Sequence, residues 1–358
     1  MRQGRIVRTD AGGRTGAQAS VPLTEPRREP LDRLFRRVLD AQADDYDPWL
    51  YRYCGRLADS DEVARYRNHL EGMLRFGRVN PGGAAVLDAG CGFGFALIVL
   101  RSLGAADVHG VDISEPMLQT IRAYLPFLPA DYRDRIHVAR ASVEQLPYKD
   151  RSLDLVLSIE AISHYRYPDA FFGEAARVLR PGGALLIRDG NNARNPKIRR
   201  ETRALWEEFE TGKPSKLGTK HERDGTYRLR REEIIREAFP GLSDEVVADL
   251  RLRTAFMSRD EIVAAVGDYA SGGARPASFF TGKDAPVDPN SGAVHERLFD
   301  AYELADRLRE SGFSVRVAGY WGGAGGNRLA SLATAVLTPA SRLAIATAPA
   351  FTIAARRL

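Results

Sequence analysis

One stretch of the chain, Ala84–Ser114, constrains the fold more than any other. Its sequence, AAVLDAGCGFGFALIVLRSLGAADVHGVDIS, runs from a short apolar strand into glycines at alternate positions, Gly90, Gly92 and Gly94. Such glycines let the backbone turn sharply and a ligand approach closely, and the helix that follows aims its N-terminus at that ligand. A second apolar strand ends at Asp112, where a carboxylate suits the hydroxyls of a ribose. The stretch therefore predicts a nucleotide-type binding loop at the edge of a parallel sheet.

The spacing of the glycines discriminates between cofactor classes. A dinucleotide loop needs G-x-G-x-x-G, but Phe95 occupies the third glycine position, so an NAD-type oxidoreductase is disfavoured. A P-loop needs Lys and Ser or Thr after its last glycine, and neither follows Gly94. The remaining pattern is D-x-G-x-G-x-G, beginning at Asp88. A carboxylate at that place suits an ammonium group better than a pyrophosphate.

The rest of the chain alternates short apolar runs with amphipathic stretches. The runs lie at 85–87, 108–111, 136–139, 153–158, 184–187 and 313–318, and the helical stretches at 94–102, 115–124, 168–179 and 300–311. Strands that alternate with helices predict an α/β fold, with a doubly wound parallel sheet and right-handed connections. The hundred or so residues from Asn191 to Phe299 are too long for a connection and carry helix signals of their own.

Three further segments complete a recognisable pattern. They are RASVEQLPYKDRSLDLVLSIEAISHY at Arg140–Tyr165, RVLRPGGALLIRD at Arg177–Asp189 and LFDAYELADRLRESGFSVRVAGYW at Leu298–Trp321. With the glycine loop they resemble class I S-adenosylmethionine-dependent methyltransferases, in the type 11 group that includes ubiquinone- and sterol-methyltransferase-like proteins. The resemblance implies a Rossmann-like, mostly parallel seven-stranded sheet with a helical insertion between strands five and six. It also implies S-adenosylmethionine as cofactor and methyl transfer as activity.

The resemblance implies roles for particular residues at the cofactor. Asp88, Gly90, Cys91 and Gly92 are expected to line the methionine end, Asp112 to hold the ribose, and Ile113 to pack against the adenine. Ser142 and Val143 stand where many members place an Asp that receives the adenine amino group, and Ser158 is expected beside the cofactor. For Cys91, a small residue tolerated in a tight loop is preferred to a nucleophile.

Candidate residues for the chemistry follow the fourth and fifth strands. Glu160 and His164 are four residues apart, which on a helix places both on one face, and His titrates near neutral pH as a general base should. Packing at a helix start is an equally weighted alternative for each. Asp189 and Asn191 are expected to face the substrate, although such residues also favour turns. Tyr320, before a glycine-rich loop, is a candidate pocket wall or a core residue.

The charge distribution and the ends complete the expectations. Residues 1–30 and 331–358 each carry a net +3, so the residues between them carry −1 of the total +5, which disfavours a nucleic-acid partner. We expect a disordered basic tail at 1–30, N-terminal helices and the cofactor-binding core at 31–190, a substrate lid at 191–297, completion of the core at 298–328 and an apolar tail at 329–358. The tail is expected either to pack on the body or to lie on a membrane surface with Arg356 and Arg357 toward lipid.

These observations favour a cytoplasmic methyltransferase, with peripheral membrane contact as an alternative location. Its acceptor is expected to be a small molecule, a sugar or a lipid, methylated on O, N or C. The six histidines are scattered and no HExxH occurs, so no metal site is expected. A non-catalytic binding or scaffold protein with the same fold remains the alternative function, and the oligomeric state is left open.

Overall fold

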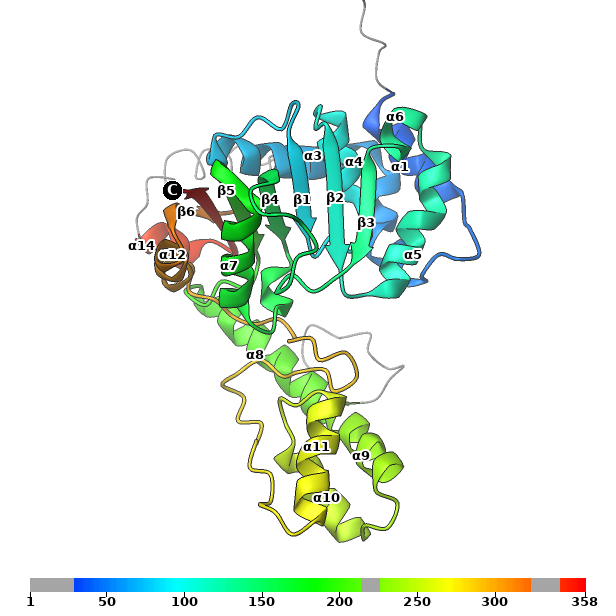
Figure 1. Ribbon diagram of the computed structural model, residues 1–358, viewed down its shortest axis with the longest axis vertical. Coiled ribbons are helices and arrows are strands. Elements are labelled where there is room, and N and C mark those ends of the chain that lie inside the picture. The colour runs from blue at the N-terminus through cyan, green and yellow to red at the C-terminus, as the bar shows by residue number, and fades with distance from the viewer. Residues whose placement is uncertain (1–28, 214–225, 323–341) are drawn as a thin grey trace, which may run out of the picture.

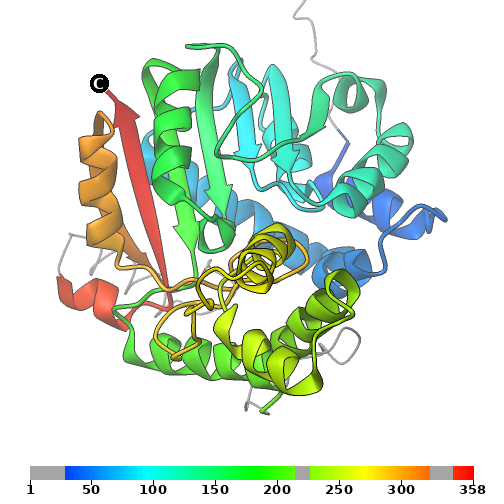
Figure 2. The same cartoon turned by 60° about the horizontal axis from the view of Figure 1, so that its bottom comes forward.

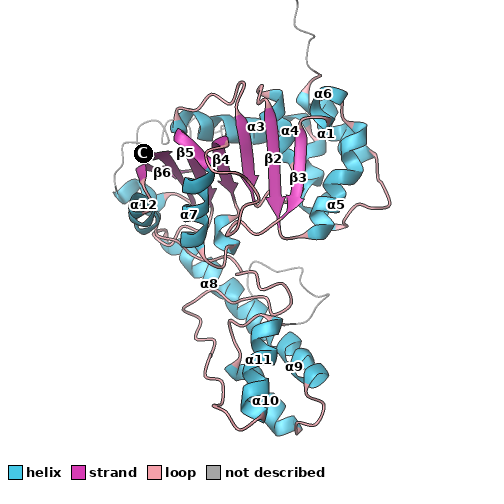
Figure 3. Cartoon of the chain, viewed as in Figure 1, coloured by secondary structure: helices cyan, strands magenta, loops and turns pink. Residues whose placement is uncertain are grey.

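A mixed sheet of seven strands organises the computed structural model, which describes residues 29–213, 226–322 and 342–358. The strand order is β3-β2-β1-β4-β5-β7-β6 (Figure 3). The strands are β1 (Ala85–Ala89), β2 (Asp107–Asp112), β3 (Ile136–Arg140), β4 (Leu153–Ile159), β5 (Leu179–Asp189), β6 (Phe313–Tyr320) and β7 (Ala350–Arg357). The first five pair in parallel, whereas β7 is antiparallel to both of its neighbours. The predicted α/β class and the seven-stranded sheet are confirmed.

For residues 350–357, the strand pairing confirms the first of the two alternatives for the C-terminal tail, which is packing on the body. Residues 350–357 form β7, inserted between β5 and β6, with the register Ile187↔Ile353 on one side and Val317↔Ile353 on the other. Arg356 donates hydrogen bonds to the carbonyls of Gly77 and Arg78, so it caps backbone rather than facing lipid. This part of the tail is therefore a sheet strand, because its apolar residues are buried from both faces. The preceding residues of the tail, up to 341, lie outside the described part.

Helices cover both faces of the sheet. Their bounds are α1 (Leu31–Asp40), α2 (Trp49–Cys54), α3 (Ser60–Gly77), α4 (Phe95–Ser102), α5 (Glu115–Tyr124), α6 (Ala130–Arg133), α7 (Pro168–Val178), α12 (Ala301–Glu310) and α14 (Arg342–Thr347), with 3-10 turns at Gly55–Ala58, Leu125–Phe127 and Ile162–His164. Figure 1 shows α7 and α12 on the near side of the sheet, with α3 and α4 behind it. The N-terminal region, expected to be helical, comprises three helices.

Alternation along the strands builds two hydrophobic cores. On β1, Val86 belongs to the core under α1, α3, α4 and α5, while Leu87 belongs to the core under α7 and α12. The same alternation occurs on β4, where Leu155 and Val156 face opposite cores. A parallel sheet buried on both faces explains why its strands read as continuous apolar runs.

Between β5 and α12 the described residues form four helices, α8 (Pro196–Thr211), α9 (Tyr227–Ala238), α10 (Asp244–Arg253) and α11 (Arg259–Ala270), followed by the segment 271–299. The last three pack around their own apolar cluster, which includes Ile235, Leu250 and Ile262. A fully buried ion pair between Arg231 and Glu210 ties α9 to α8. Figure 1 shows that α9, α10 and α11 form a lobe beyond the end of α8, on the side toward which the parallel strands point. Figure 2 brings this lobe forward, in front of the carboxyl ends of the strands.

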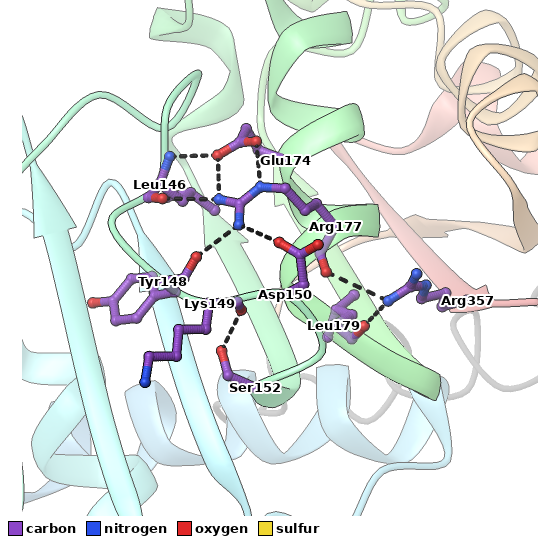
Figure 4. Close-up of polar contacts among 9 residues, drawn as sticks. All are labelled: Leu146, Tyr148, Lys149, Asp150, Ser152, Glu174, Arg177, Leu179 and Arg357. Atoms are coloured by element: carbon purple, nitrogen blue, oxygen red, sulfur yellow. Dashed lines mark hydrogen bonds and ion pairs between the residues drawn. The ribbon is translucent and has the colours of Figure 1, made fainter.

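The connection that follows β3 is tied to α7 by one arginine. Figure 4 shows Arg177 bridging this connection: it donates to the carbonyls of Tyr148 at 2.7 Å and Leu146 at 2.9 Å and pairs with Glu174 at 2.7 Å. Glu174 in turn accepts from the backbone N–H of Leu146 at 2.6 Å. The hydrogen bonds to Glu174 and to Asp150 raise the pKa of the guanidinium. The network fixes the connection that carries two of the expected adenine-side residues.

Candidate functional site

The glycine loop after β1 has the backbone geometry that its sequence requires. Gly90 has φ +75°, and a Cβ there would fall 2.7 Å from the Cβ of Ala161. Gly92 has φ +51°, but a Cβ there would meet nothing closer than Met117 Sδ at 4.0 Å. Packing therefore requires a glycine at position 90. At position 92 the missing side chain leaves open space above the loop, where a ligand can approach.

Asp88 lies under this loop with an unusual environment for a carboxylate. It is 3% exposed, and its Oδ1 has no hydrogen-bond partner among the residues that the structure describes. Burial, and then the negative charge of Asp112, raise its pKa to about 7. A buried acceptor without a donor is costly unless a ligand supplies one. The ammonium group of S-adenosylmethionine is a donor of the right charge, so Asp88 fits the cofactor that the resemblance implies.

Asp112 holds the glycine loop as well as ending β2. One of its oxygens accepts from the backbone N–H of Gly92 at 2.9 Å, and the other from that of Ser114 at 2.9 Å. Ile113, the next residue, is 48% exposed, which leaves an apolar surface beside the carboxylate. Cys91 is buried, and burial followed by the charges of Asp88 and Asp112 raises the pKa of its thiol well above its usual value. A protonated thiol agrees with the structural role preferred for Cys91.

The expected adenine-side residues and Ser158 are placed by packing. Ser142 Oγ accepts from the backbone N–H of Glu144 at 3.2 Å, and Val143 is buried in the core under α7. Ser158 is fully buried and shares a hydrogen bond of 2.9 Å with Tyr165 Oη, which also donates to the carbonyl of Ala89 at 2.7 Å. Tyr165 therefore supports the glycine loop from below, a role that the sequence reasoning missed.

The expectation that Glu160 and His164 share a helical face is wrong. Glu160 has φ +48° and lies between β4 and the turn Ile162–His164, so the two residues do not share a helix. A Glu160 oxygen accepts from the backbone N–H of Gly190 at 2.9 Å. Burial and then the charge of Asp189 raise the pKa of Glu160. The turn after β4 nevertheless presents both residues at the carboxyl end of the sheet.

His164 is oriented by the segment that precedes α12. Its Nδ1 lies 3.0 Å from the carbonyl oxygen of Val294, and a carbonyl only accepts, so Nδ1 carries the proton. The neutral ring then has its lone pair on Nε2, which lies 3.8 Å from Glu296 Oε1. Glu296 was not found from the sequence, because it is 132 residues from His164 and no local pattern marks it.

Two of the expected substrate residues join this group. Asp189 is fully buried and accepts from the backbone N–H groups of Asn191 at 2.8 Å and Ser163 at 3.2 Å. Its pKa is raised, mainly by burial. The Asn191 side-chain amide donates to Glu296. Three carboxyl groups therefore converge near His164: Glu160 directly after β4, Asp189 at the end of β5 and Glu296 in the segment before α12. We call these three residues and His164 the acidic cluster (Glu160, His164, Asp189 and Glu296).

Tyr320 packs against His69 and Arg188, and burial, followed by the charge of Glu160, raises its pKa. Its Oη is 2.8 Å from His69 Nδ1, and the buried Arg188 guanidinium stacks 3.8 Å from the centre of its ring. Burial and then the charge of Arg188 lower the pKa of His69 to about 3. Successive residues of a strand face opposite sides of the sheet, so Arg188 and Asp189 lie on opposite faces. Tyr320, which stacks on Arg188, therefore lies on the face opposite Asp189.

Two features are absent from the described residues. No group of three or more His, Cys, Asp or Glu there is arranged to hold a metal ion. No helix in the same ranges is long and apolar enough to cross a membrane.

Comparisons with known proteins agree with the geometry of the glycine loop. Residues 87–187 match a family model described as a methyltransferase domain. The chain is 36% identical over 133 residues to 27-O-demethylrifamycin SV methyltransferase of Amycolatopsis mediterranei, covering 36% of this chain and 45% of that protein. It is 33% identical over 139 residues to fatty-acid O-methyltransferase of Mycolicibacterium smegmatis, covering 37% and 46%. It is also 34% identical over 105 residues to tRNA U34 carboxymethyltransferase of Idiomarina loihiensis, covering 29% and 32%.

The aligned segments span less than half the length of these three relatives. The family-model match, residues 87–187, ends before the insertion and lies on the part of the chain that carries β1 to β5, Asp88, Asp112 and the glycine loop. The buried Oδ1 of Asp88, which has no hydrogen-bond partner among the described residues, fits a cationic ligand group at this loop. Residues 87–187 of this chain are therefore a methyltransferase domain of the class I S-adenosylmethionine-dependent family.

Proposed function

We propose that this chain transfers a methyl group from S-adenosylmethionine to a hydroxyl or amine of a small-molecule, sugar or lipid-type acceptor. The observation that carries the proposal is the acidic cluster at the carboxyl ends of β4 and β5, on the same edge of the sheet as the glycine loop. The cofactor, when bound, supplies a methyl group on a positively charged sulfur. Two relatives are named for such acceptors: 27-O-demethylrifamycin SV methyltransferase and fatty-acid O-methyltransferase. Their names support an acceptor of this kind.

The chain's own contribution is to hold the cofactor and to remove the acceptor's proton. Asp88 would bind the ammonium group, and Asp112, through its remaining lone pairs, would bind the ribose. His164 is the proposed base, because its Nδ1–H is fixed by the Val294 carbonyl and its Nε2 is left as the acceptor. Glu296 is a positioning residue, whose charge stabilises His164 once it is protonated. Glu160 is the alternative base, since its raised pKa suits proton transfer near neutral pH.

The insertion is proposed to act as a lid over the acceptor. Its last segment delivers Glu296 and Val294 to His164, so the candidate base is complete only with the insertion docked. The −1 charge of the body supports a neutral or weakly charged acceptor rather than nucleic acid.

Calorimetry and a turnover assay test the proposal in two stages. S-adenosylhomocysteine is expected to bind the wild type, and Asp112→Ala to weaken binding by about 1.5–3 kcal/mol, the scale of hydrogen bonds to a charged group. Transfer from radiolabelled S-adenosylmethionine is then screened against hydroxy fatty acids, polyketide polyols, sugars and tRNA. His164→Asn is expected to lower kcat by about 10²–10⁴-fold without changing cofactor affinity.

Matched variants separate catalysis from structure. His137→Asn changes a half-exposed histidine on β3, away from the site, and should leave kcat unchanged. Glu296→Gln should lower kcat more than it changes KM, because it removes the carboxylate charge that lies 3.8 Å from Nε2 of His164. Failure of a folded wild type to bind the cofactor product would refute the proposal. Binding without turnover on any acceptor would favour the scaffold alternative.

A further inference from the structure

A separate pocket of about 570 Å³ lies where the insertion meets the sheet domain. Residues before α7, on α8 and in the segment 283–298 line it, whereas His164, Asn191 and Glu296 do not. We propose that this pocket binds a small organic oxyanion, a carboxylate or phosphate carried on an apolar body. The proposal does not depend on methyl transfer, because it concerns residues outside the acidic cluster.

The charge of the pocket wall is strongly positive. Its lining includes one carboxylate, Asp284, and the following five cationic side chains: Arg166, Arg199, Arg203, Lys283 and Arg297. Within the described ranges, only Arg166 of these five has a carboxylate at ion-pair distance. Several guanidinium groups facing one space attract an anion and match its oxygens in pairs.

The two inner arginines keep unused hydrogen-bonding capacity. Arg166 donates through Nη2 to both oxygens of Glu261 at 2.8 Å, but its buried Nη1 has no acceptor in the part of the chain that the structure describes. Arg297 donates to the carbonyls of Tyr165 at 3.1 Å and Arg166 at 3.4 Å. Burial, and then the charges of Arg307 and Arg166, lower the pKa of Arg297. An anion in the pocket would face both guanidinium groups and offset their mutual repulsion.

The rest of the wall is apolar and rigid. Trp206 is 2% exposed, and its Nε1 donates to the carbonyl of Glu296 at 3.1 Å, which fixes the indole. Phe256, Val294 and Leu298 complete this side of the pocket. A pocket with an apolar wall and a few convergent polar groups is typical of small-molecule sites. The combination selects a ligand with one charged end and a flat or aliphatic body.

Calorimetric titration of the full chain, without S-adenosylmethionine, tests the proposal. The probes are phenyl phosphate and benzoate, compared with inorganic phosphate and benzyl alcohol. We expect saturable binding of at least one aromatic anion at millimolar concentration or below, and the stronger of the two identifies the oxyanion. Arg199→Gln/Arg203→Gln is expected to weaken it by about tenfold or more, because two charged donors are lost. Both side chains are on exposed positions of α8, so the variant should fold.

Arg200→Gln is the matched control, since Arg200 is exposed on the same helix but does not line the pocket. Its affinity for the aromatic anion should stay within about twofold of wild type, as expected for a surface charge. The proposal is overturned if neither aromatic anion binds, if the double variant binds like Arg200→Gln, or if benzyl alcohol or inorganic phosphate binds as tightly as the aromatic anions.

Discussion

Binding of S-adenosylhomocysteine to this chain should strengthen as the pH rises toward 7, because the proposed ammonium acceptor is half protonated at that pH. Burial and Asp112 raise the pKa of Asp88 to about 7 in the free protein. A bound ammonium group favours the carboxylate, so the complex forms with release of a proton below the free-state pKa. Affinity should therefore fall about tenfold for each pH unit below 7, until the pKa of the complex is reached.

Calorimetry between about pH 5 and about pH 7.5 measures this slope, a range in which the ligand's amino group stays protonated. Titrations in buffers of different ionisation enthalpy report the released proton directly. Asp88→Asn should remove the slope and weaken binding at the upper end by about 1.5–3 kcal/mol, roughly 10- to 150-fold. A wild-type affinity that is independent of pH, or an equal slope in Asp88→Asn, would refute the assignment of the ammonium group to Asp88.

The same carboxyl gives an independent stability measurement without ligand. Its pKa is higher in the folded protein than its ordinary value of 3.8, so the folded state binds more protons between about pH 4 and about pH 7. The stabilisation is present below that window and is lost as the pH rises through it. Asp88→Asn should accordingly be more stable than wild type at pH 8, by urea unfolding, and no different near pH 3.5.

Three further changes probe the fold. Tyr165→Phe leaves the Ala89 carbonyl and Ser158 without their partner, and should lower the free energy of unfolding by about 1–3 kcal/mol in urea titrations. Glu210→Ala leaves the buried Arg231 charge unpaired, and should cost about 3–5 kcal/mol, whereas an unchanged midpoint would show that water reaches this pair. Deleting residues 350–357 should abolish the cooperative thermal transition followed by circular dichroism, since β5 and β6 then lose their shared neighbour.

Much of the sheet could be predicted because each buried parallel strand is a short apolar run followed by a turn. β7 could not be, because its sequence AFTIAARR continues an Ala-rich segment and ends in two arginines. Only the tertiary structure shows that those arginines donate to backbone carbonyls at the end of the strand. Burial from both faces had removed the alternation that marks an antiparallel strand.

The two halves of the candidate site, the glycine loop and the acidic cluster, differ in how much of each the sequence predicts. The residues at the glycine loop are local to one motif, so spacing places Asp88 and Asp112 at adjoining strand ends. The acidic cluster is not local: Glu296 arrives from the far end of the insertion. The positive φ of Glu160 also could not be predicted from the sequence, because no sequence pattern marks a glutamate in that conformation. The four-residue spacing of Glu160 and His164 therefore predicted a shared helical face, but the backbone there does not form a helix.

The position of β7 has a consequence for how the chain is made. During synthesis β5 is complete long before β7 emerges, and the whole insertion, α12 and β6 are translated in between. Throughout that time the outer edge of β5 offers unpaired backbone groups to any other strand, the usual starting point of aggregation. The lobe of α9, α10 and α11 has its own apolar cluster, so it can fold while the outer edge of β5 is still unpaired. Expression yield should thus depend on chaperone protection late in translation, after the β1–β5 region has formed.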